Sequence, residues 1–100
     1  MVDIRIWGQL SLPEQMGHIG GELKLARDAE DDDLELRDEH IDASLELLEL
    51  TLKDFRFRKN MSELEYLHTA IMNWKMDEPS WPPQSMVNYC ASFLLDEMTD

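Results

Sequence analysis

The strongest constraint on the fold is a long run of apolar residues at helical spacing in the middle of the chain. Between residues 34 and 57 most apolar positions recur every three or four residues, and acidic side chains occupy much of the remaining surface. The apolar stripe consists of Leu34, Ile41, Leu45, Leu48, Leu52 and Phe55. One such stripe must be buried against other elements, so the sequence predicts a helix over residues 34–57 within a helical core.

A preceding helix is predicted over residues 12–29. Ser11 and Glu14 have the Ser-x-x-Glu spacing of a capping box, and Pro13 falls in the first turn, where its missing N–H does no harm. The apolar stripe that follows is Met16, Ile19, Leu23 and Ala26. It is interrupted by three glycines, Gly17, Gly20 and Gly21. Because each glycine costs about 1 kcal/mol relative to alanine in a helix interior, we interpret them as points of close packing rather than of local weakness.

Two further helices are predicted in the second half of the chain, over residues 61–77 and 82–97. A basic cluster precedes the first of them and complements the C-terminus of the helix before it. The cluster is Lys53, Arg56, Arg58 and Lys59. The helix over residues 61–77 presents Leu64, Leu67, Ile71 and Trp74 on one side. The last helix follows the Pro-rich segment 80–83.

Residues 1–10 are expected to form a short extended arm, since they are apolar and carry a turn signal at Gly8. Four amphipathic helices joined by short connections pack most simply as an up-and-down bundle. We therefore expect residues 1–100 to form one all-α domain, an up-and-down bundle of three to four helices with this arm lying against it.

The chain is strongly acidic, with 22 acidic and 9 basic residues and a formal net charge of -13. Such a surface repels the phosphates of nucleic acids and the anionic heads of lipids, so we expect neither direct nucleic-acid binding nor membrane binding. Acidity is compatible with a basic protein partner, with imitation of nucleic-acid charge, with cation binding, or with solubility alone.

Cys90 is the single cysteine, so it cannot form an intramolecular disulfide, and it falls on the buried stripe of the last helix. Residues 1–7 lack the basic and apolar segments of a secretory signal, and no apolar run approaches the ~20 residues of a membrane span. A cytoplasmic protein is expected. No phosphate-binding glycine loop, serine elbow or paired-cysteine zinc motif is present in the sequence, and we expect no cofactor.

One pattern is compatible with a divalent metal. Glu65 and His68 have the Glu-x-x-His spacing that paired copies use to hold two metal ions in four-helix bundles. Only one copy exists, so His18 and Glu22 on the helix over residues 12–29 would have to complete the site. Acidic chains contain many such pairs by chance, and a solvated helix face is the simpler interpretation. A small metal-dependent helical enzyme is therefore an alternative function.

Aromatic and methionine side chains concentrate around the last inter-helix turn, and they provide the main functional hypothesis. Trp, Tyr and Met are enriched at binding surfaces, so an exposed cluster would indicate a partner groove or a dimer face. The residues are Trp74, Met76, Trp81 and Tyr89. The competing interpretation is that they cap the core. We expect a non-enzymatic interaction module for a protein partner or a second copy of the chain. An acidic charge mimic that inhibits a nucleic-acid-binding protein is a further alternative.

Several short segments resemble a group of small uncharacterised bacterial helical proteins, which carry a Met-x-x-Ile-Gly segment, a leucine-rich LELLxLT helix and an aromatic C-terminal helix. The matching segments are MGHIGGE at residues 16–22, SLELLELT at 44–51, SEL at 62–64 and NW at 73–74. The resemblance covers residues 13 to 95. This chain departs from the group in its long acidic turn and in the Pro-rich segment 80–83. The resemblance implies a compact helical domain and supplies no site residues.

Overall fold

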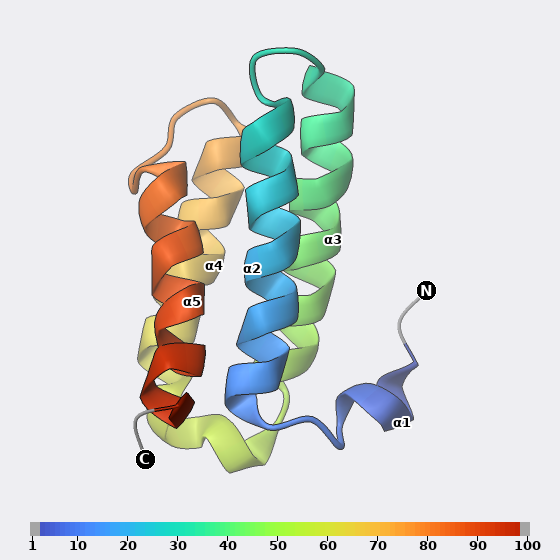
Figure 1. Ribbon diagram of the computed structural model, residues 1–100, viewed down its shortest axis with the longest axis vertical. Helices are drawn as coiled ribbons and strands as arrows, with labels where there is room; N and C mark the ends of the chain where they lie inside the picture. The colour runs from blue at the N-terminus through green and yellow to red at the C-terminus, as the bar shows by residue number, and fades with distance from the viewer. Residues whose placement is uncertain (1–2, 99–100) are drawn as a thin grey trace.

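The computed structural model describes residues 3–98, and this part of the chain is all-α, with no strand, as the sequence predicts. Four long helices lie along the longest dimension and alternate in direction, and one short helical turn projects from one end (Figure 1). The elements are α1 (Ile4–Trp7), α2 (Leu12–Ala29), α3 (Leu34–Leu52), the 3₁₀ helix η1 (Phe55–Asn60), α4 (Met61–Lys75) and α5 (Pro83–Met98). Among residues 3–98, no helix has both the length and the apolar character needed to cross a membrane.

The helix α1 replaces part of the extended arm that we expected over residues 1–10, whose first two residues lie outside the described range. The side chain of Asp3 accepts a hydrogen bond of 2.9 Å from the backbone N–H of Arg5 and so caps a single helical turn. The turn carries Trp7 to the bundle, where its ring is buried. A buried amide, Gln15 Nε2, donates to the carbonyl oxygen of Trp7 at 2.9 Å and holds the segment in place.

Helix α2 begins at Leu12, and the capping box is formed. Ser11 Oγ accepts from the backbone N–H of Glu14 at 3.2 Å, and Glu14 Oε1 accepts from the backbone N–H of Ser11 at 2.9 Å. These hydrogen bonds from Ser11 lower the pKa of the Glu14 carboxyl, because they favour its charged form.

The close-packing interpretation of the glycines holds for two of the three. A Cβ added at Gly20 would lie 2.8 Å from Cys90 Cβ, and one added at Gly17 would lie 3.3 Å from Leu94 Cδ1. Helix α5 therefore approaches α2 as closely as it does because Gly20 has no side chain. A Cβ at Gly21 would meet no atom within 4 Å, so close packing does not explain this third glycine.

Helix α3 ends at Leu52, five residues before the end that we expected. Asp54 adopts an extended backbone, and its side chain accepts from the N–H of Arg56 at 3.0 Å, which starts η1. This change of backbone direction decides which of two neighbouring phenylalanines is buried. Phe55, expected on the buried stripe, is 75% exposed, and Phe57 is buried instead.

The core lies between α2, α3, α4 and α5, and its large, fully buried side chains come from all four helices. They include Met16, Ile19 and Leu23 of α2, Ile41 and Leu48 of α3, Leu64, Leu67, Ile71 and Trp74 of α4, and Met86 of α5. The backbones of the helices do not approach one another equally. Helix α2 packs closely along α3 and α5, and α3 packs along α4, whereas the backbones of α4 and α5 make few close approaches.

Candidate partner-binding site

Aromatic rings fill the seam between α4 and α5, two helices whose backbones make few close approaches. The ring of Trp81, just before α5, contacts Tyr66 of α4 at a centroid distance of 5.8 Å and Tyr89 of α5 at 5.5 Å. Tyr89 in turn meets Phe93 one turn later at 5.3 Å, edge to face. We call these four residues the aromatic surface. Tyr66 is 61% exposed, and the other three rings are partly exposed.

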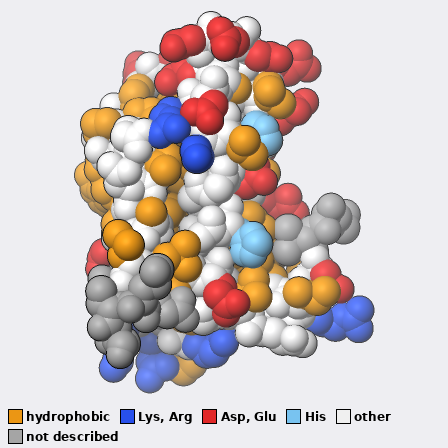
Figure 2. Space-filling model, viewed as in Figure 1, with side chains coloured by type: hydrophobic (Ala, Val, Ile, Leu, Met, Phe, Trp, Pro, Cys, Tyr) orange, Lys and Arg blue, Asp and Glu red, His pale blue; other side chains and the backbone are white. Residues whose placement is uncertain are grey.

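The aromatic surface contains an open hollow of about 240 Å³. Its lining residues are Ser62, Glu63, Tyr66, Trp81 and Tyr89. Three of them come from the first turns of α4, at spacings that place them on neighbouring positions of one helix face. In Figure 2, hydrophobic side chains gather over α5 and the segment that leads into it, at the left of the view. Three of the five side chains that line the hollow are aromatic, and Glu63 is the one charged residue among them.

One hydrogen bond fixes the polar edge of the hollow. The hydroxyl of Tyr89 donates to Glu63 Oε1 at 2.8 Å and links α5 to α4. Partial burial, and then this hydrogen bond, raise the pKa of the Tyr89 phenol above its ordinary value, so the hydroxyl keeps its proton and remains the donor. Glu63 is held beside the rings as the acceptor.

The structure divides the four residues that we expected to bind a partner. Trp81 and Tyr89 lie in the aromatic surface, and Met76 is 73% exposed at the end of α4 but does not line the hollow. Trp74 is fully buried, and its indole N–H donates to Glu30 Oε1 at 2.8 Å. Trp74 is therefore a core residue and no part of the surface, because the stripe of α4 turns it inward.

Sequence reasoning missed three residues of the hollow, Ser62, Glu63 and Tyr66. Tyr66 stands on the polar face of α4, next to the exposed Glu65, where a large aromatic ring has no core to fill. This position on the polar face could have identified Tyr66 as a surface residue from the sequence. A tyrosine on the solvent side of an amphipathic helix is a better indicator of a binding surface than Trp74 on its apolar stripe.

The structure does not assemble the metal site that we considered. His68 Nε2 lies 3.4 Å from Glu49 of α3, whereas Glu22 lies 2.7 Å from Nδ1 of His40. Among the described residues, no group of three or more His, Cys, Asp and Glu side chains is placed to hold a metal ion. Glu65 and His68 thus do not meet His18 and Glu22, because the two pairs belong to different seams of the bundle.

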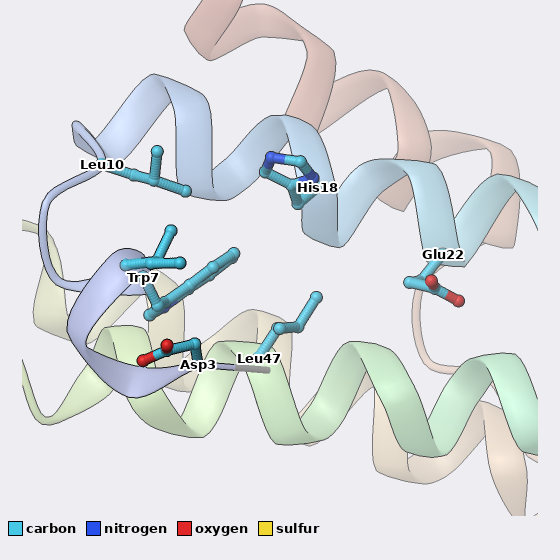
Figure 3. A pocket seen from close by; sticks show the side chains of 7 residues that line it. Asp3, Trp7, Leu10, His18, Glu22 and Leu47 are labelled. Atoms are coloured by element: carbon cyan, nitrogen blue, oxygen red, sulfur yellow. The ribbon is translucent and has the colours of Figure 1, made fainter. Parts of the chain in front are cut away.

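His18 and Glu22 instead line a second hollow, of about 340 Å³, beneath α1 (Figure 3). Figure 3 shows both on α2, with His18 on the side of Trp7 of α1 and Leu47 of α3, and Glu22 about one turn further along the helix. The ring of His18 lies 5.8 Å from the ring of Trp7. The indole N–H of Trp7 is buried and has no hydrogen-bond partner among the described residues.

Cys90 has the environment of a core residue. Its side chain is fully buried, and burial raises the pKa of its thiol from 9.0 to about 12. A nucleophilic cysteine needs exposure and a lowered pKa, so this thiol has neither property.

Charge is distributed unevenly along the bundle. Acidic side chains crowd the end that carries the α2–α3 turn, and basic side chains gather at the opposite end, near η1 (Figure 2). At the acidic end the guanidinium of Arg37, 3% exposed, pairs with Asp77 at 2.8 Å and with Asp38 at 3.0 Å. The ion pair with Asp77 joins the start of α3 to the residues that follow α4.

Comparison with known proteins adds no functional information. No family model matches the chain, and neither a curated protein nor a solved structure is similar to it at a meaningful level. The resemblance to small bacterial helical proteins stays a prediction, and any function has to be argued from the sites described above.

Proposed function

We propose that this protein is a non-enzymatic interaction module that binds a basic protein partner through the aromatic surface. The observation that carries the proposal is the contact of three partly exposed rings around an open hollow, with the carboxylate of Glu63 at its edge. Aromatic residues bury a large area on binding and are enriched at the centres of protein interfaces.

The position of these rings supports a binding role over a purely structural one. Tyr66 presents most of its side chain to solvent, although α4 has a complete apolar stripe without it. A single exposed ring needs no explanation, but Tyr66 contacts Trp81, and a contiguous exposed patch of this kind is typical of an interaction site. Phe93 extends the surface along α5, so a partner would contact a continuous strip of rings.

Charge favours a basic partner over a second copy of the chain. The net charge of -13 makes two copies repel each other, whereas it attracts a basic protein and accelerates the encounter. We place the interaction in the cytoplasm, where a free buried thiol such as Cys90 is stable. The up-and-down arrangement of four helices then acts as a rigid support for the seam between α4 and α5.

The test compares two exposed aromatic residues at different places on the molecule. Tagged wild-type protein, Tyr66→Ala and Phe55→Ala are used to capture proteins from a lysate of the native cells at low salt. Each captured protein is then purified and its affinity is measured by calorimetry. Phe55 is the matched control, because it is 75% exposed and lies on η1, outside the aromatic surface.

We expect one basic protein that binds wild type and Phe55→Ala equally and binds Tyr66→Ala at least about tenfold more weakly, as for an interface hot spot. Equal affinity for all three forms would overturn the proposal. So would a dimer in light scattering that Tyr66→Ala dissociates, since a second copy would then occupy the surface. A partner that Tyr66→Ala does not affect, and that salt releases, would support the acidic mimic instead.

A further inference from the structure

We infer that the hollow in the aromatic surface is a cation pocket, which takes the guanidinium of an arginine or the ammonium of a lysine from the partner. The inference rests on the proposed function and names the chemistry that its site recognises. It depends on three properties of the hollow: aromatic walls, a carboxylate at the edge, and no positive charge of its own.

The walls of the hollow are the rings of Tyr66, Trp81 and Tyr89. The planes of Trp81 and Tyr66 are inclined at 62° and those of Trp81 and Tyr89 at 51°, so the three rings that line the hollow do not form one flat plate. The face of an aromatic ring is electron-rich and attracts a cation within about 6 Å of the centroid, tryptophan most strongly. In a hollow of about 240 Å³ with these walls, a bound side chain would lie near more than one ring at once.

The carboxylate of Glu63 gives the hollow a counter-ion. Its Oε1 is engaged by Tyr89, and within the described part of the chain no basic side chain forms an ion pair with it. The second oxygen, Oε2, is left to accept a charge-assisted hydrogen bond from a guanidinium or ammonium group. An anion would be repelled here, and a purely apolar side chain would offer no donor to Oε2.

The chain places its own cations over other rings. Arg56 lies 4.8 Å from the ring centroid of Phe57, and Arg58 lies 4.5 Å from that of Phe55, both on η1. Among residues 3–98, no arginine or lysine makes this contact with Tyr66, Trp81 or Tyr89. The hollow therefore combines aromatic rings with a negative charge and has no arginine or lysine in its lining.

The test is a titration followed by two-dimensional ¹H–¹⁵N NMR, in which the three tryptophans give three indole signals. The probe is N-acetyl-arginine amide, and the matched control is N-acetyl-citrulline amide, which has nearly the same shape and no charge. N-acetyl-lysine amide distinguishes an arginine pocket from a general cation pocket. The titrations use the whole chain at physiological salt, first as wild type and then as Glu63→Gln, whose amide oxygen can still accept from Tyr89.

We expect the arginine probe to shift the indole signal of Trp81 and to leave the buried Trp74 signal in place. The citrulline probe and the Glu63→Gln variant should each bind about fivefold more weakly, as for a partly exposed cation–π contact and ion pair. Equal shifts from arginine and citrulline, or a Trp81 signal that stays in place at tens of millimolar probe, would overturn the inference. If only the NMR signals of the acidic turn at residues 30–35 shift, the inference is also overturned, because such shifts show non-specific attraction of the cationic probe to acidic side chains.

The two proposals can fail separately. If a partner needs Tyr66 but the arginine probe does not bind, the surface is an interface without a cation pocket. If the arginine probe binds at Trp81 and no partner depends on Tyr66, the pocket exists and the proposed function is wrong.

Discussion

The Tyr89 hydroxyl lies 2.8 Å from Glu63 Oε1, and this hydrogen bond holds a negative charge beside the ring of Trp81. Tyr89 reaches Glu63 across the seam between α4 and α5, so the bond joins two helices whose backbones make few close approaches. The same two side chains therefore help to close the fold and shape the hollow. Their removal should affect binding more than stability.

The variant Tyr89→Phe tests this relationship. It keeps the ring against Trp81 and Phe93 and removes only the donor to Glu63. Because the bond is at the surface, its loss should change the free energy of unfolding by about 1 kcal/mol or less. Affinity for a basic partner should fall several-fold, since Glu63 is no longer held in place. Urea unfolding and calorimetry measure the two effects, and a large loss of stability with unchanged affinity would contradict the account.

The glycines of α2 give a matched pair of substitutions. Gly20→Ala places a Cβ 2.8 Å from Cys90 Cβ, which forces α2 and α5 apart and should destabilise the fold by about 1–3 kcal/mol. Gly21→Ala meets no atom within 4 Å and should stabilise the fold by up to about 1 kcal/mol through helix propensity. Urea denaturation of both variants measures the difference. Equal effects would mean that the close approach of α2 and α5 does not depend on Gly20.

Arg37 should contribute more to stability than a surface arginine. Its side chain is nearly buried and pairs with Asp77 and Asp38, so Arg37→Ala removes packing and leaves acidic groups without their cation. Because these partners are themselves partly exposed, we expect a loss of about 2 kcal/mol. Arg5→Ala, at an exposed pair with Asp3, should cost less than about 0.5 kcal/mol. Thermal unfolding of both variants is the measurement, and similar costs would refute the difference.

The fold should lose stability in alkaline solution. Burial raises the pKa of the Cys90 thiol from 9.0 to about 12, and the pKa of Tyr89 is raised as well. Both groups ionise more readily in the unfolded chain, so their contribution is complete below pH 9 and declines as the pH rises towards 12. Unfolding free energies measured over this range test the sign, with Cys90→Ala as the variant whose decline should be smaller. A stability that rises with pH would contradict the buried state of the thiol.

The features that the sequence predicted correctly depend on residues that lie close together along the chain. The Ser11–Glu14 capping box marks the start of α2, and the all-α class follows from the apolar stripes. The end of α3 was misplaced, because the stripe continues to Phe55 while Asp54 redirects the backbone into η1. The periodicity of the apolar residues does not show whether a helix continues for another turn or ends before a capping side chain such as Asp54.

The candidate site was predicted only in part, for a physical reason. Trp74 and Trp81 have the same side chain and lie seven residues apart, but one is enclosed by the core and the other covers a seam. Which of them reaches the surface depends on how the four helices pack. This packing depends on contacts between residues far apart in the sequence, such as Gly20 of α2 against Cys90 of α5, which no local pattern contains.

The most direct test of the central claim is site-specific photo-cross-linking in the native cell. Benzoylphenylalanine is placed at position 66, in the aromatic surface, or at position 55, on the exposed ring of η1. We predict that light joins the protein with the probe at position 66 to one basic protein, and that the probe at position 55 gives no such product. Absence of the product at position 66, or the same product from both positions, would contradict binding through the aromatic surface.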